Sequence, residues 1–168
     1  MLDITLHALS RFPEQLEAYF AAIPIELRHW APDSWEGVPS EPFTAIEQIC
    51  HVRDIEVDGY QVRLRRTLEE DDPLLLSLDG EALARQRDYA GADPVAVLAD
   101  FRQARRQTLA LIEALVAEQF MRPARFQGYG ALTLRSLVHY LCSHDQQHLA
   151  GLQWLLGKMA ALAAAPFH

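Results

Sequence analysis

Apolar residues recur at intervals of three and four along four long stretches of the chain, which is the spacing of a helix with one buried face. These stretches cover residues 6–29, 45–70, 94–118 and 133–157. Thr44 and Glu47 have the spacing of a capping box, and Asp93-Pro94 is a strong helix start. Pro24 predicts a kink or break inside the first stretch. The pattern therefore predicts four helices.

The segments between the helices contain proline and glycine and are predicted as loops over residues 31–41 and 120–131. Residues 71–93 are mixed, and a short helix is expected at 81–87. The alanine-rich tail, residues 159–168, is expected to pack loosely or fray. Four amphipathic helices bury their apolar stripes most simply in a bundle. We predict an all-α fold in one domain, a four-helix bundle with a long connection between helices two and three.

Composition and charge narrow the class of protein. Half of the 168 residues are apolar and the formal net charge is −8, which argues against nucleic-acid binding. The one dense basic stretch, residues 63–66, is followed at once by acidic residues, so we interpret it as a solvated helix face. No apolar run reaches the ~20 residues of a membrane span, and no signal peptide is evident. We expect a cytoplasmic protein that binds neither nucleic acid nor membrane.

The strongest local signal for chemistry is a pair of histidines four residues apart, His144 and His148. Residues at this spacing lie on one helix face, where two imidazoles can bind one ion. The pair belongs to an apolar line, namely Leu134, Leu137, Leu141, His144, His148, Leu152 and Leu155. Both rings should therefore face the core, where their nitrogens need a metal or hydrogen bonds. Because such pairs also arise by chance, the spacing alone leaves both interpretations open.

A third ligand would complete a catalytic site, since such sites commonly use three protein ligands and keep one position open. His51 is the candidate, on a line with Ile55, Asp58 and Val62 of the second helix. A lone helical histidine is more often a packed core residue, and both interpretations stay open here. His139 lies one position off the leucine line and is expected to pack or to make a hydrogen bond.

Two cysteines, Cys50 and Cys142, fall inside the helical pattern. In a reducing compartment, two buried free thiols are the simplest expectation for them. Both also lie near the histidines in sequence, so a redox or ligand role stays open.

Two short motifs occur together in this chain. Residues 50–56 read Cys-His-Val-Arg-Asp-Ile-Glu, and residues 144–148 read His-Asp-Gln-Gln-His. They resemble the H-x-x-D-x-E and H-D-x-x-H motifs of the DinB/YfiT-like superfamily, and the resemblance extends from the first helix to about Gly157. It implies a four-helix bundle, often a homodimer, whose histidines bind nickel or zinc. The metal ligands that it implies here are His51, His144 and His148.

The resemblance also implies a reaction class. Three neutral imidazoles leave the full charge on a divalent ion, which can activate either water or a thiol. We expect a metal-dependent enzyme acting on a small molecule, either a hydrolase or an S-transferase that uses a low-molecular-weight thiol. The alternative is a non-catalytic, dimeric metal-binding module. No glycine-rich phosphate loop and no Ser-His-Asp arrangement is evident, so any chemistry would come from the metal.

Three carboxylates near His51 in sequence are candidates for a general base. Asp58 lies two turns from His51 on the same helix face and is the better candidate, with Asp54 as the second. Glu56 is the third. Each of them could equally occupy a surface position or form a salt bridge.

Overall fold

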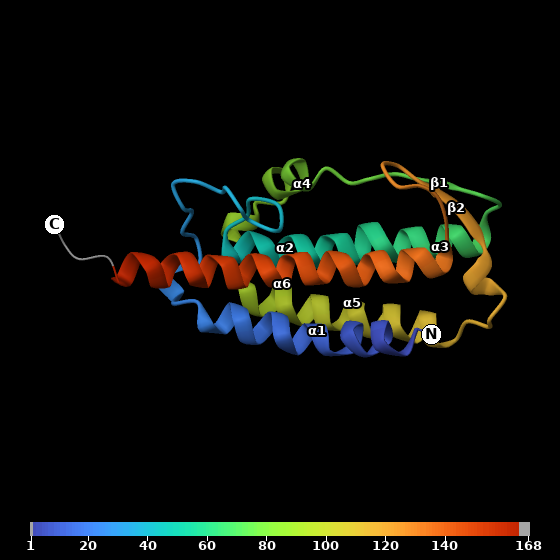
Figure 1. The fold of residues 1–168 in the computed structure, drawn as a ribbon, viewed down its shortest axis with the longest axis horizontal. Coiled ribbons are helices and arrows are strands. Elements are labelled where there is room, and N and C mark those ends of the chain that lie inside the picture. Colours follow the sequence, from blue (N-terminus) through green and yellow to red (C-terminus); the bar gives the residue numbers. More distant parts are fainter. Residues whose placement is uncertain (1, 165–168) are drawn as a thin grey trace.

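The computed structural model describes residues 2–164. Its long helices are α1 (Asp3–Ala22), α2 (Ala45–Asp54), α3 (Gln61–Glu69), α5 (Pro94–Glu113) and α6 (Leu134–Ala164). Because α2 and α3 continue one another, the helices make four rods that lie along the long axis of the molecule (Figure 1). Buried apolar side chains from all four rods form the core. The predicted four-helix bundle is confirmed.

The helix starts follow the sequence signals closely. Thr44 and Glu47 form the expected capping box at the start of α2. The side chain of Asp93 accepts a hydrogen bond from the Val95 amide, 3.0 Å, at the start of α5. The chain also breaks where Pro24 predicts it, because α1 ends at Ala22 and a short 3-10 helix, η1 (Ile25–Leu27), follows.

A π-helical turn, η2 (Ile55–Tyr60), joins α2 to α3. A π turn holds more residues than an α turn, so it changes which side chains face the core, and such turns are frequent at functional sites. Within this turn, the side chains of Glu56 and Tyr60 are both buried. The apolar spacing of residues 45–70 predicts the rod but carries no sign of the extra residue.

The connection between α3 and α5 crosses the whole bundle, as predicted. Figure 1 shows that the α2–α3 rod and α5 run in the same direction, opposite to α1 and α6. The chain must therefore return along the bundle between them. It does so through β1 (Leu74–Leu75), the short helix α4 (Gly80–Gln86) and η3 (Tyr89–Gly91). The short helix expected near residues 81–87 is confirmed.

A small sheet corrects the prediction of a loop over residues 120–131. Strands β2 (Pro123–Phe126) and β3 (Gly130–Thr133) pair antiparallel, and β1 pairs parallel to β2, in the order β1-β2-β3. The turn between β2 and β3 needs glycine, because Gly128 and Gly130 have φ of 85° and 80°. The strands have two to four residues each, so they show too little alternation to predict.

Two helix ends also differ from the prediction. Helix α5 stops at Glu113, before the predicted residue 118, and a 3-10 turn, η4 (Gln119–Met121), follows shortly after. Helix α6 continues to Ala164, so the expected fraying of the tail is wrong for residues 159–164. Met159 explains part of this difference, because its side chain packs into the apolar core. Residues 165–168 of the tail lie outside the described residues.

The basic stretch on α3 is only partly a solvated face. Arg65 is exposed, as interpreted, but Arg63 is only 6% exposed. Its guanidinium lies over the ring of Phe126, 4.5 Å from the centroid. The interpretation is therefore wrong for Arg63, because the later sheet covers this side of the helix. Among the described residues, no helix is long and apolar enough to cross a membrane.

Candidate metal centre

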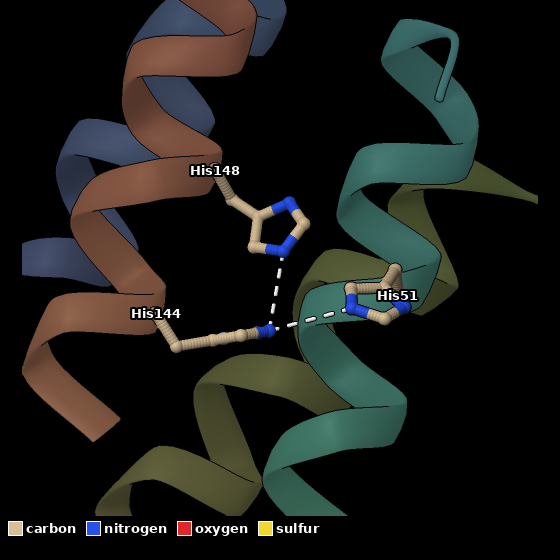
Figure 2. Close-up of side chains that lie close together, drawn as sticks. All are labelled: His51, His144 and His148. Atoms are coloured by element: carbon tan, nitrogen blue, oxygen red, sulfur yellow. Dashed lines mark hydrogen bonds between the residues drawn. The ribbon is translucent and has the colours of Figure 1, made fainter. Parts of the chain in front are cut away.

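The three histidines predicted as ligands come together between two helices. His51 projects from α2, and His144 and His148 project from α6 one turn apart, so that the rings point toward one another (Figure 2). The Nε2 atom of His144 lies 3.3 Å from Nε2 of His51 and 3.1 Å from Nε2 of His148. The same ring atom of each residue thus faces a common point.

This geometry fits a metal ion. One ligand atom from each histidine lies within 4.8 Å of the others, so the group could hold an ion. Ligand nitrogens at ~2.1 Å from a tetrahedral ion are themselves about 3.4 Å apart. The separations of 3.1 and 3.3 Å are close to that value. Imidazole nitrogen is also a preferred ligand of zinc and nickel.

The surroundings keep the imidazoles of His51 and His144 neutral, which metal binding requires. His51 and His148 are buried and His144 is partly buried. Burial, together with the nearby His148, lowers the pKa of His51 to about 4. Burial, His148 and His51 hold the pKa of His144 well below its usual value. Near neutral pH, the lone pairs of His51 and His144 are therefore available to a cation.

Gln48, one turn before His51, orients the ring of His148. Its side-chain amide nitrogen donates to Ser40 Oγ, 2.8 Å, and to the carbonyl oxygen of Phe43, 3.3 Å. The amide oxygen of Gln48 must therefore face the other way, where it contacts Nδ1 of His148. An amide oxygen only accepts, so Nδ1 of His148 carries a proton. In the neutral ring, the lone pair is then on Nε2, which faces the cluster.

Gly151 makes room for this arrangement. A Cβ atom at this position of α6 would lie 2.4 Å from Ser40 Oγ and 3.0 Å from Nε2 of Gln48. Both distances are too short for ordinary contact, so a larger residue would displace the two side chains. The sequence analysis missed Gln48, although its position one turn before His51 on a buried face was a usable signal.

Glu41 is a second residue that the sequence analysis missed. It lies in the loop before α2, with one carboxylate oxygen 3.2 Å from Nε2 of His148 and the other 3.7 Å from Nε2 of His51. The closeness of His148 is the main reason that the pKa of Glu41 falls to about 2. An ionised carboxylate therefore stands beside the three histidines. No periodic signal in an irregular loop could have placed it there.

The outer side of His51 packs against α4. A Cβ atom at Gly80 would lie 2.7 Å from Cε1 and 3.0 Å from Nδ1 of His51, so only glycine fits against the ring without displacement. Nδ1 of His51 is buried and has no hydrogen-bond partner among the described residues. The long connection between α3 and α5 thus contributes to the position of His51.

The two predicted base candidates belong to a separate group of charges. Nη1 of Arg87 lies 2.9 Å from Oδ2 of Asp54 and 2.8 Å from Oδ2 of Asp58. Asp54 also accepts hydrogen bonds from the Tyr89 hydroxyl, 2.6 Å, and from Nε of Arg53, 2.7 Å. Among the described residues, neither aspartate is hydrogen-bonded to a histidine of the cluster. Their role as general bases stays a prediction.

The third candidate, Glu56, lies in a buried ion-pair network. Arg105 of α5 donates two hydrogen bonds to Glu56, 3.0 and 2.9 Å, and two to Asp145, 2.7 and 3.0 Å. It also donates to the carbonyl oxygen of Leu9, 3.0 Å. All three charged side chains are about 1% exposed. One acidic residue of each sequence motif, Glu56 and Asp145, therefore meets the same arginine.

A cavity of about 130 Å³ opens beside two of the three histidines, His51 and His144. Glu41, His51 and His144 contribute to its walls. The remainder of the lining includes Tyr60 and Arg63 of the α2–α3 rod and aromatic residues of the small sheet. Larger cavities of about 470 and 490 Å³ are lined by none of the three histidines. The small cavity is therefore where a substrate could reach the cluster.

The remaining candidates lie outside the cluster. Cys50 is buried and Cys142 is partly buried, and both are free. Burial raises the pKa of Cys50 to about 12, so this thiol stays protonated near neutral pH. Neither sulfur belongs to the group that could hold a metal among the described residues. His139 forms the expected hydrogen bond, with Oγ1 of Thr5 at 3.0 Å from Nδ1.

Fold and site together define a class, a four-helix bundle that carries a three-histidine cluster able to hold a metal ion. Residues 8–152 match the model of the DinB superfamily, so this chain belongs to that superfamily. The structure of YfiT from Bacillus subtilis, described as a probable metal-dependent hydrolase with an unusual four-helix bundle topology, matches with a TM-score of 0.80. The two share 22% sequence identity, over 94% of this chain and 87% of that chain. A comparison with curated proteins found no match.

Proposed function

We propose that this protein is a metal-dependent enzyme in which His51, His144 and His148 hold a divalent ion. The observation that carries the proposal is the convergence of three Nε2 atoms from two helices at one partly enclosed point. Membership of the DinB superfamily supports it. Nickel and zinc are the ions that we propose first, because imidazole suits both.

A divalent ion held by three neutral imidazoles lowers the pKa of a water or thiol ligand towards neutrality. We propose either a hydrolase, which uses water, or a thiol S-transferase, which uses a low-molecular-weight thiol. Gln48 keeps the lone pair of His148 directed at the cluster. Glu41 is placed to accept a hydrogen bond from the nucleophile and so to orient it. The adjacent cavity admits a small-molecule substrate.

The test begins with metal analysis of protein purified without an affinity tag. We expect one divalent ion per chain, which chelation removes. The reloaded protein is then assayed with model esters in water, and separately with a thiol plus an electrophile. A hydrolase turns over without thiol, whereas a transferase consumes thiol and electrophile in equal amounts. Turnover that survives complete chelation would end the metalloenzyme proposal.

The second candidate function is a non-catalytic metal-binding module. Glu41 favours it, because a carboxylate so close to two of the histidines could act as a fourth ligand, and closed four-ligand sites are usually structural. Glu41→Gln separates the candidates. Unchanged metal affinity with reduced turnover supports the enzyme, and a large loss of affinity without any turnover in the wild type supports the module.

The expected homodimer stays a prediction, which light scattering in solution can check.

A further inference from the structure

A buried arginine on the wall of the small cavity, Arg63, has no acidic partner within residues 2–164. The guanidinium of Arg63 lies between the rings of Phe126 and Tyr60, 4.5 and 5.1 Å from their centroids. Its Nε and Nη2 atoms both donate to the carbonyl oxygen of Leu76, at 3.3 and 3.1 Å. Among the described residues, Arg63 forms no ion pair, and its Nη1 atom has no hydrogen-bond partner.

Arg105, the other buried arginine, differs from Arg63 in having acidic partners. Arg105 is neutralised by two carboxylates, Glu56 and Asp145. Buried charges are normally paired in this way, because an unpaired charge is costly to desolvate. The chain has 23 acidic and 15 basic residues, so carboxylates are not scarce. An unpaired buried guanidinium that lines a cavity is therefore suited to an anion from outside the chain.

The acidic residue on the cavity wall, Glu41, forms no ion pair with Arg63. Glu41 also lines the cavity, but its two oxygens are directed at His148 and His51. Arg63, His51 and His144 all line this cavity, so the cation and two histidines of the cluster share one small space. An anion held by Arg63 would therefore lie next to the histidines.

The cavity also limits the size and shape of the anion. At about 130 Å³, it holds roughly four water molecules, each of which occupies about 30 Å³ in the liquid. Aromatic rings of Tyr60, Phe126 and Tyr129 form much of the lining, which suits a flat group. Arg63 is the single arginine or lysine on the wall, and the wall also carries the ionised carboxylate of Glu41, so there is no surplus of positive charge for a multiply charged anion. These features favour a carboxylate over a phosphate, which carries more charge and needs more donors.

We propose that Arg63 binds the carboxylate of a small organic acid in this cavity and presents its reactive group to the three histidines. The binding step depends only on residues of the chain, whereas the role of this acid as substrate rests on the proposed function. The substrate class is then a small carboxylic acid with a hydrolysable or electrophilic group near the carboxylate.

The test measures binding of propionate and of its neutral counterpart propionamide by NMR titration, in metal-free and metal-loaded protein. We expect propionate, and not propionamide, to bind the wild type. Arg63→Gln should weaken this binding about tenfold to a hundredfold, because a charge-assisted hydrogen bond is lost. Arg63→Lys keeps the charge and should retain part of the affinity. Arg65→Gln, the same change on the exposed face of α3, should retain all of it.

Wild-type titrations keep the proposal testable even if a variant fails to fold. Propionate must shift the amide signals of Ser77, Leu78 and Tyr129, which line the cavity. Four outcomes would each overturn the carboxylate assignment. Two come from the wild type, namely signal shifts only outside the cavity and equal binding of propionamide. The others are full propionate affinity in a folded Arg63→Gln protein and tighter Arg63-dependent binding of inorganic phosphate. Arg63-dependent binding without any metal-dependent turnover would sink the proposed function alone. Metal-dependent turnover that is indifferent to a carboxylate on the substrate would overturn this inference alone.

Discussion

Two buried polar clusters lie next to each other in this bundle, and they differ in how completely their groups are satisfied. In one, Arg105 meets the carboxylates of Glu56 and Asp145, so every charge has a partner. In the other, three Nε2 atoms face one another, and Nδ1 of His51 has no partner. Nitrogens that converge on one point cannot all satisfy each other. The first cluster is complete within the chain, whereas the second could hold a metal ion.

Asp145 and His144 are neighbours in α6 and yet belong to different clusters. Adjacent helical residues point about 100° apart, so one turn of helix serves both groups. The motif His-Asp-x-x-His thus combines two functions, because its histidines build the site and its aspartate ties α6 to α5. Mutations in the two clusters should therefore have different consequences, the first on binding and turnover and the second on stability.

Removal of one ligand should have the largest effect. In His148→Ala, we expect the bound metal to be lost and any metal-dependent turnover to fall by orders of magnitude, because two imidazoles remain. Metal analysis and the assay that detects wild-type turnover check this. His139→Ala is the matched control, since His139 is on the same helix and bonds Thr5 outside the cluster. A His148→Ala protein with one metal per chain and normal turnover would contradict the assignment.

Disruption of the complete cluster should lower stability instead. Arg105→Met leaves two buried carboxylates without a partner and should reduce the free energy of unfolding by about 3–5 kcal/mol. Urea denaturation measures this change. Arg102→Met is the control on the exposed face of α5, where loss of the ion pair with Glu17 should cost less than about 1 kcal/mol. We expect the folded Arg105→Met protein to bind metal. A loss of metal binding without a loss of stability would contradict this prediction, because Arg105 would then support the histidine cluster rather than the stability of the bundle.

The difference between the clusters also explains what the sequence could predict. His144 and His148 follow from local helical spacing, because the line of leucines around them indicates which face is buried. His51 needed the resemblance between motifs, since no local rule relates α2 to α6. The bundle and its long connection follow from four apolar stripes and the length of residues 71–93.

The rest depends on contacts between distant segments. Glu41 reaches the histidines from an irregular loop, and β1 becomes a strand only because residues 125–126 pair with it. Arg63 resembles its exposed neighbour Arg65 in sequence, but the sheet that buries it comes about 60 residues later in the chain. The burial of Asp145 was predictable from the sequence but was missed. Asp145 lies four residues after Leu141 and four before Leu149, and both leucines are buried.

The incomplete cluster should make the metal-free protein sensitive to acid. Burial holds the pKa of His51 at about 4 in the folded chain, against 6.5 in its absence. Between these values the unfolded chain binds a proton that the folded chain does not bind. The free energy of unfolding should therefore fall as the pH drops from 6.5 to 4, by about 3 kcal/mol from His51. Denaturation curves across this range, compared with His51→Gln, check the slope. An equal slope in both proteins would contradict the prediction.

The smallest effect should come from Gln48, which touches the cluster only through His148. Gln48→Leu removes the acceptor for Nδ1, so the ring can rotate and can place its proton on Nε2 instead. We expect the variant to fold and to bind zinc about 10–100-fold more weakly, a loss typical of such supporting contacts. Competition with a chelator of known affinity measures it, and the ring ¹⁵N shifts of His148 report the tautomer. Gln147→Leu, on the exposed face beside His148, should change neither. If Gln48→Leu keeps wild-type affinity and the proton stays on Nδ1, the packing of α6 rather than the amide of Gln48 orients the ring.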